Sequence, residues 1–195
     1  MPHDQTEAQL VAELNDLIRL DHDAVGAYTL AIAKLENEEY RASLREFRGD
    51  HERHIQELSA LVRARGSEPA GAPHPPPPGF FKPAIQALGA LGGDRAVLLA
   101  FKSNEGQVRD KYRRHADRPH PGDVEPVLRR AALDEERHYA WVEQVLEALG
   151  AGPGTVLGTL EKGLEAVHGR ISDVEEALLR KVAERKEEAR RGGAA

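Results

Sequence analysis

The sequence predicts an all-α protein built around a four-helix bundle, and three features of its 195 residues lead to that prediction. Helix signals run along nearly the whole chain, whereas the alternating β-branched pattern and the Asn-Gly turns of a sheet are nearly absent. Four long segments carry apolar residues at alternating steps of three and four. One long Pro-rich stretch separates the first two segments from the last two, and such a crossover makes the second and third helices run parallel.

The first two helices are expected to form a hairpin. Thr6 followed by Gln9 reads as a capping box that opens a helix running to about Glu36. A tight connection around Asn37 leads to a second helix over about 38–65. Gly66 follows at once, and a glycine in that position is the usual helix stop.

The second pair of helices follows the Pro-rich stretch "GSEPAGAPHPPPPGFFKP", residues 66–83, which predicts an extended, polyproline-like crossover. A short apolar helix is expected after it, ending near Gly92 and Gly93. Asp94 is then expected to cap a third long helix that ends at about His115. After the turn "DRPHPGD", a fourth helix is predicted over about 124–149.

A fifth helix is predicted over about 156–191, which divides the chain into a bundle at 1–150 and a C-terminal helix at 151–195. Its apolar residues form a narrow stripe on an otherwise charged helix, which is typical of a coiled-coil interface or of a strap across the bundle. We expect homo-oligomer formation through residues 156–182.

The composition excludes several classes of function. A net charge of −6 and a pI near 5.9 argue against nucleic acid as a partner, because phosphate neutralisation requires a basic surface. The absence of cysteine excludes disulfides, thiolate zinc sites and cysteine catalysis. The N-terminus has no signal-peptide pattern, and no apolar run approaches the roughly 20 residues of a membrane helix. We therefore expect a cytoplasmic protein without a membrane partner.

Ionisable residues interrupt the apolar face near the middle of all four predicted helices. They are Asp21, His51, His54, Glu105, Glu135 and His138. An internal repeat relates them, because Asp21 precedes Glu105 by 84 positions, and the same offset relates His51 to Glu135 and His54 to His138. A pseudo-twofold axis between two helical hairpins would bring both sets to one central site.

Three carboxylates and three imidazoles buried together need a compensating partner, because burying unpaired charge is costly. Divalent metal ions are the natural partner: they neutralise carboxylates, and histidine binds them as the neutral base. The helical spacing of Glu135 and His138 places the two side chains on adjacent turns of one face, where both can reach the same ion. The alternative is a hydrogen-bonded polar network without metal.

The stretch "DEERH", residues 134–138, resembles the Glu-x-x-His motif of ferritin-like di-iron carboxylate proteins such as bacterioferritins and rubrerythrins. Tyr28 and Tyr112 each follow a first-helix acid by seven residues, which also occurs in that family. The resemblance covers residues 6 to about 149 and is greatest to small bacterial ferritin-like proteins. It implies the six residues above as metal ligands, with iron as the metal in a di-iron or mononuclear site, and zinc or manganese as alternatives.

Two residues depart from the family pattern. Asp21 stands where the family usually has Glu, and His51 stands where the first motif would supply a bridging Glu. Only Glu135 is left in a bridging position. Three carboxylates leave one positive charge over when two divalent ions bind, so the second ion is expected to bind more weakly.

Several functions remain open at this stage. The leading expectation is metal binding with oxidation of Fe(II) by O2 or peroxide, in iron handling or the oxidative stress response, as a ferroxidase- or peroxidase-like oxidoreductase. The alternatives are a structural bundle stabilised by zinc or a single ion, and an interaction module acting through the fifth helix. Tyr28 and Tyr112 would be catalytic in the first case, or core residues bonded to nearby acids. For Asp50 and Asp134, a solvated helix face is favoured over a hydrogen bond to histidine.

Overall fold

The computed structural model describes residues 6–72 and 93–150, which form four α-helices and, within those ranges, no strand. The helices are α1 (Glu7–Lys34), α2 (Glu38–Ala64), α4 (Gly93–Ala116) and α5 (Glu125–Ala148). The predicted all-α four-helix bundle is confirmed. The rest of the crossover, the short helix expected after it, the helix at 156–191 and the association surface at 156–182 lie outside the described residues.

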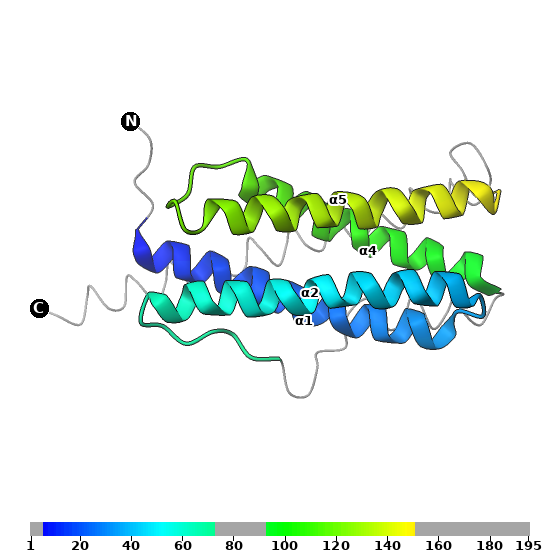
Figure 1. Cartoon of the computed structure of the whole chain (residues 1–195), viewed down its shortest axis with the longest axis horizontal. Coiled ribbons are helices and arrows are strands. Elements are labelled where there is room, and N and C mark those ends of the chain that lie inside the picture. Colours follow the sequence, from blue (N-terminus) through cyan, green and yellow to red (C-terminus); the bar gives the residue numbers. More distant parts are fainter. Residues whose placement is uncertain (1–5, 73–92, 151–195) are drawn as a thin grey trace, which may run out of the picture. The chain divides into compact units, whose positions relative to one another are not determined.

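The four helices pack as a square. Each of α1 and α5 contacts both α2 and α4, and the contacts are most extensive within the hairpins α1–α2 and α4–α5. Figure 1 shows that α1 and α5 run in one direction while α2 and α4 run in the other. The second and third helices are therefore parallel, as the position of the long crossover predicts.

Local sequence signals fix the helix ends. The capping box is present, since the Thr6 side chain accepts from the backbone of Gln9 and the Gln9 side chain accepts from the backbone of Thr6. Asn37 caps α2, because its side-chain oxygen accepts from the backbone N–H groups of Glu39 and Tyr40. Gly66 and Gly150 follow α2 and α5 with φ of 67° and 71°, a conformation that favours glycine. These two glycines are also 84 positions apart.

Asp94 has a different role from the expected cap. Helix α4 already begins at Gly93, so Asp94 lies within its first turn. Its carboxylate accepts from the backbone N–H groups of Glu36 and Asn37, at 2.6 and 2.9 Å. These two groups lie in the turn between α1 and α2, where they have no helical partner. Asp94 therefore joins the start of α4 to the first hairpin.

The apolar core follows the predicted helix faces, with one regular shift. A strict alternation of three and four along α2 and α5 places Leu61 and Val145 on the buried face near the helix ends, but Val62 and Leu146 are buried instead. In both helices the buried residue lies one position further along the chain than the strict pattern places it. The two buried residues, Val62 and Leu146, are 84 positions apart. The reason is that a straight helix has 3.6 residues per turn, so a strict three-four pattern drifts away from the core after several turns.

None of the described helices is both long enough and apolar enough to span a membrane.

Candidate metal centre

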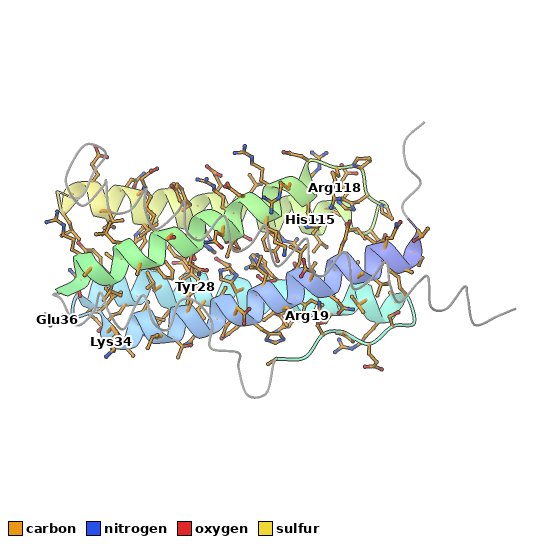
Figure 2. All side chains as sticks on the ribbon, turned by 180° about the vertical axis from the view of Figure 1, so that it is seen from behind. Arg19, Tyr28, Lys34, Glu36, His115 and Arg118 are labelled. Atoms are coloured by element: carbon orange, nitrogen blue, oxygen red, sulfur yellow. The ribbon has the colours of Figure 1, made fainter. Side chains whose placement is uncertain are left out.

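All six predicted site residues come together in the middle of the bundle. Helix α1 supplies Asp21 and α4 supplies Glu105, while α2 and α5 each supply two residues, and all six side chains are at most 1% exposed. Figure 2 labels Tyr28 on α1, and its hydroxyl bonds Glu105 of this cluster. The four helices therefore bring both copies of the internal repeat to one place.

The six residues form two overlapping sets of donor atoms. The first set is Asp21, His51, His54 and Glu135, and the second is His51, Glu105, Glu135 and His138. Within each set, one donor atom per residue lies within 4.8 Å of all the others. Each set could hold a metal ion, and the two sets share Glu135 and His51. We call them the Asp21 half-site and the Glu105 half-site.

Glu135 faces both half-sites with different oxygens. Its Oε1 lies 3.5 Å from Nδ1 of His54, and its Oε2 lies 3.6 Å from Nδ1 of His138. One carboxylate thus offers one oxygen to each histidine. This is the position that the sequence predicts for a bridging carboxylate.

Several buried polar atoms in this cluster have no hydrogen-bond partner. They are Nε2 of His51, Nδ1 of His54, Nδ1 of His138, Oε1 of Glu105 and both side-chain oxygens of Glu135. A buried polar atom without a partner costs free energy, of order 1–3 kcal/mol each. Six such atoms within one cluster indicate that the residues suit a cation. A bound cation would give the unpartnered oxygens of Glu105 and Glu135 a partner.

The two tyrosines cross between the halves. Tyr28 on α1 donates its hydroxyl to Oε2 of Glu105 on α4 at 3.0 Å. Tyr112 on α4 donates to Oδ2 of Asp21 on α1 at 2.6 Å. Each tyrosine therefore orients the acid of the other hairpin. These bonds match the expectation of core tyrosines bonded to nearby acids, and a redox role for the tyrosines remains a prediction.

Asp50 and Asp134 each bond a histidine of the other hairpin, contrary to the expectation that they lie on a solvated helix face. Oδ2 of Asp134 lies 3.2 Å from Nε2 of His54, and Oδ2 of Asp50 lies 3.0 Å from Nε2 of His138. An acid on Nε2 fixes the tautomer that leaves Nδ1 free to bind a metal. In both histidines, that free Nδ1 points to the shared Glu135.

Two arginines complete this outer layer. Arg53 bonds Asp50 on its own helix and Asp134 on α5, while Arg137 bonds Asp50 on α2 and lies 3.5 Å from Asp134. The two arginines balance the two aspartates. The outer layer is therefore neutral, and the charge of the inner three carboxylates remains to be compensated. The sequence carried a signal for it, because the offset of 84 also relates Asp50 to Asp134 and Arg53 to Arg137.

Burial governs the acid–base behaviour of the Glu105 half-site. It raises the pKa of Glu105 to about 8, although the hydrogen bond from Tyr28 acts in the opposite direction. Burial and the charges of Glu105 and Asp21 raise the pKa of Glu135 well above its usual value. Burial also lowers the pKa of His138 to about 3, with the charge of His51 acting in the same direction. His138 is therefore neutral at pH 7, which is the form that binds metal.

The Asp21 half-site behaves differently. Burial acts to raise the pKa of Asp21, but the hydrogen bond with His51 and the nearby imidazole of His54 outweigh it and hold that pKa below its usual value. Burial acts to lower the pKa of His54, but Asp21 and Asp134 outweigh it and raise that pKa. Asp21 is thus ionised at neutral pH.

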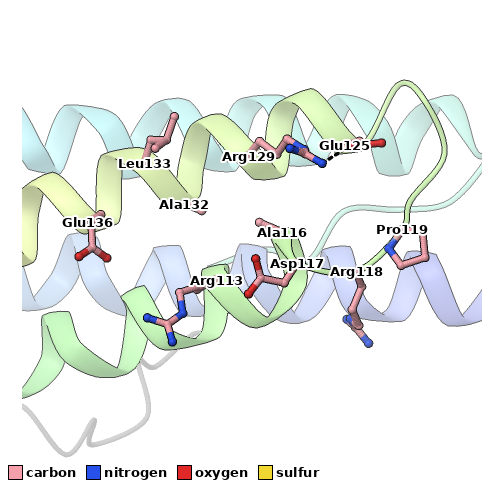
Figure 3. A pocket seen from close by; sticks show the side chains of 10 residues that line it. All are labelled: Arg113, Ala116, Asp117, Arg118, Pro119, Glu125, Arg129, Ala132, Leu133 and Glu136. Carbon is pink, nitrogen blue, oxygen red and sulfur yellow. Dashed lines mark ion pairs between the residues drawn. The ribbon is translucent and has the colours of Figure 1, made fainter.

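A surface pocket lies away from this cluster, where α4 ends and α5 begins (Figure 3). Three arginines and three acids line it together with Leu133, which is 72% exposed. Opposite charges therefore balance along its wall, and none of its lining residues belongs to the buried cluster. The six ligand candidates and this pocket are separate features of the molecule.

Comparison with known proteins gives one match. A family model described as "Domain of unknown function (DUF2383)" matches residues 9–72, which include the first hairpin and three of the six clustered residues. No curated protein and no solved structure matches the chain significantly.

Proposed function

We propose that this protein binds divalent transition-metal ions in the bundle core, with iron as the principal metal, and that it is a ferritin-like protein. The observation that carries the proposal is the set of six buried, unpartnered donor atoms contributed by five residues on three helices. A hydrogen-bonded polar network without metal would leave those atoms unsatisfied. The histidines and carboxylates also form the mixed nitrogen and oxygen donor set that iron, zinc and manganese accept.

The ferritin-like relationship is supported by connectivity and by position together. The parallel arrangement of α2 and α4 is the one expected for a bundle with a single long crossover. One acid comes from each of α1 and α4, and the paired ligands come from α2 and α5. The replacement of a bridging Glu by His51 separates this chain from the usual di-iron pattern.

The proposed activity is oxidation of Fe(II) by peroxide or O2. With peroxide, each of two Fe(II) ions gives up one electron, the O–O bond breaks, and two protons taken up give two water molecules. The chain's own contribution is to hold the ions at the Asp21 and Glu105 half-sites, to exclude bulk water from the core and to keep His138 neutral. Tyr28 holds the Glu105 carboxylate in place by its hydrogen bond.

A second function has its own supporting observation. Two histidines and two carboxylates make up the Asp21 half-site; zinc accepts both donor types, and structural zinc sites have four protein ligands. In that case the ion would stabilise the bundle and no oxidation would occur. The two functions differ in metal identity and in redox activity.

The test begins with metal analysis of protein purified without added metal, followed by anaerobic loading with Fe(II) and exposure to peroxide or O2. The proposal expects bound Fe(II) that is oxidised faster than Fe(II) in buffer. Tightly held zinc without oxidation would support the structural function and reject the oxidase. Protein that binds no divalent ion, and whose melting temperature is unchanged by chelator, would reject metal binding altogether.

A further inference from the structure

We infer that the two half-sites are unequal: Asp21, His51, His54 and Glu135 form a closed four-donor site for the first divalent ion. Glu105, His138 and the second oxygen of Glu135 then form an open three-donor site for a second ion. This inference rests on the proposed metal binding and adds the order and the coordination type.

The donor atoms of the Asp21 half-site already have the spacing of ligands around one ion. Nδ1 of His51 lies 2.9 Å from Oδ1 of Asp21 and 3.5 Å from Oε1 of Glu135. Nδ1 of His54 lies 3.6 Å from the same Asp21 oxygen and 3.5 Å from the same Glu135 oxygen. Four of the six separations among these atoms therefore lie between 2.9 and 3.6 Å, and the other two are within 4.8 Å.

These separations fit a small tetrahedral ion. Ligands at roughly 2.0–2.1 Å from a zinc-sized ion are separated by about 3.4 Å when they stand at the corners of a tetrahedron. The four distances lie on both sides of that value, so an ion needs only small side-chain shifts to bind. Four protein donors complete the coordination of such an ion, which is the arrangement of closed structural sites.

The Glu105 half-site is looser, and it shares its fourth member, His51, with the Asp21 half-site. Nδ1 of His138 lies 3.8 Å from Oε2 of Glu105 and 3.6 Å from Oε2 of Glu135. His51 is the fourth member of this set, and its Nε2 is buried without a partner, but its Nδ1 lies 2.9 Å from Asp21 in the other half-site. When neutral His51 binds the first ion through Nδ1, its Nε2 carries the ring proton and has no lone pair for the second ion. Three protein ligands then remain and leave a coordination position free, as catalytic metal sites require.

The asymmetry comes from one pair of repeat positions, because His51 stands where Glu135 stands in the other copy. A carboxylate has an oxygen for each ion, as Glu135 has here. A neutral imidazole has only one unprotonated nitrogen, so His51 can bind only one ion. His51 therefore strengthens the half-site that its Nδ1 faces.

Charge leads to the same order of binding. Asp50 and Asp134 are balanced by Arg53 and Arg137, so only the three inner carboxylates compensate bound ions. The first divalent ion leaves one net negative charge in the core. The second reverses the sign, and an uncompensated buried positive charge is costly. The second ion therefore binds more weakly than the first.

The experiment is a titration of the metal-free, full-length protein with Zn²⁺ and with Co²⁺. The visible absorption of Co²⁺ is much stronger in a four-coordinate tetrahedral site than in a six-coordinate one. We expect one tight equivalent that produces a strong tetrahedral spectrum, and a second equivalent at least about tenfold weaker. Two equivalents of equal affinity would overturn the inference and leave metal binding intact, whereas no binding would reject the proposed function itself.

Matched variants assign the tight ion to one half. His54→Ala should abolish the tight equivalent, whereas His138→Ala, the same change at the repeat-related position, should keep it together with its Co²⁺ spectrum. His51→Glu should bring the two affinities closer together by restoring a second bridging carboxylate. Circular dichroism in chelator checks that each variant is folded. Loss of the tight ion in His138→Ala, with retention in His54→Ala, would overturn the assignment, and the wild-type titration decides the inequality of the sites if a variant does not fold.

Discussion

The hydroxyl of Tyr112 donates to Oδ2 of Asp21 at 2.6 Å, and this bond links α4 to α1 inside the core. Its repeat-related counterpart is the bond from Tyr28 to Glu105 at 3.0 Å. The acceptors differ in charge. Asp21 has a lowered pKa and is ionised at neutral pH, whereas Glu105 has a pKa of about 8 and keeps its proton in the metal-free protein.

The first prediction compares Tyr112→Phe with Tyr28→Phe. Tyr112→Phe removes a hydrogen bond to a buried charge, and we expect a loss of about 1.5–3 kcal/mol in the free energy of unfolding. Tyr28→Phe removes a bond between neutral groups, with an expected loss of about 0.5–1.5 kcal/mol. Urea unfolding at pH 7 in chelator measures both. The two variants serve as controls for each other, and equal losses would contradict the difference in charge.

The second prediction concerns the outer acids. Asp134→Asn and Asp50→Asn should each weaken metal binding by about 10- to 100-fold, because these acids orient His54 and His138 through Nε2. Isothermal titration with Zn²⁺ measures the effect. Glu52→Gln is the control, since that neighbouring carboxylate is half exposed and pairs with Arg48. If all three variants bind alike, the outer acids do not position the histidines.

Sequence reasoning identified the inner site because the six residues carry three independent signals. They break the apolar face of their helices, they stand at helical spacing, and they repeat with one offset. Those signals place all six in one buried cluster, as the structure does. The metal itself and its redox activity are not contained in these signals.

The outer layer could not be placed in the same way. Asp50 lies one position away from His51, which on an ideal helix points it toward solvent. The side chain nevertheless reaches Nε2 of His138 on α5, and Arg137 on the same helix donates to the same carboxylate oxygen. Such a contact depends on the neighbouring helix rather than on the pattern of its own helix. The same applies to Asp94, whose partners lie 57 and 58 positions away.

The third prediction follows from that contact. Asp94→Ala should lower the free energy of unfolding by about 1.5–3 kcal/mol, because two backbone N–H groups lose a charged acceptor. Glu39→Ala, an exposed change beside the same turn, should stay within about 0.5 kcal/mol of wild type. Urea unfolding provides the measurement. If Asp94→Ala leaves the free energy of unfolding unchanged, water replaces the carboxylate at no cost.

The fourth prediction is the pH dependence of the metal-free protein between about pH 6.5 and 8. In this range Glu105 holds a proton in the folded state, where its pKa is about 8, but has lost it in the unfolded chain, where the pKa is 4.5. The folded state thus binds more protons, so its stability must fall as the pH rises. His54 acts in the same direction, because its pKa is raised on folding.

The other shifted site residues oppose this trend only at the lower end of the window. His138, with a folded pKa of about 3 against 6.5 when unfolded, is half protonated in the unfolded chain at pH 6.5 and becomes neutral in both states as the pH rises above that value. Asp21 is ionised in both states. Below pH 6.5 the contribution of His138 makes the stability rise with pH, because this side chain binds a proton in the unfolded chain but not in the folded one. Melting temperatures in chelator should therefore fall from pH 6.5 to 8.

Bound metal should remove most of this dependence, because the ion replaces the proton on Glu105 and holds the carboxylate ionised. The rise in melting temperature on adding Zn²⁺ should then grow steadily from pH 6.5 to 8. Glu105→Gln provides the control, since it has no proton to lose, and its metal-free melting temperature should depend less on pH than that of wild type. A stabilisation by Zn²⁺ that is constant over this range would show that Glu105 is not among the groups that exchange a proton for the metal.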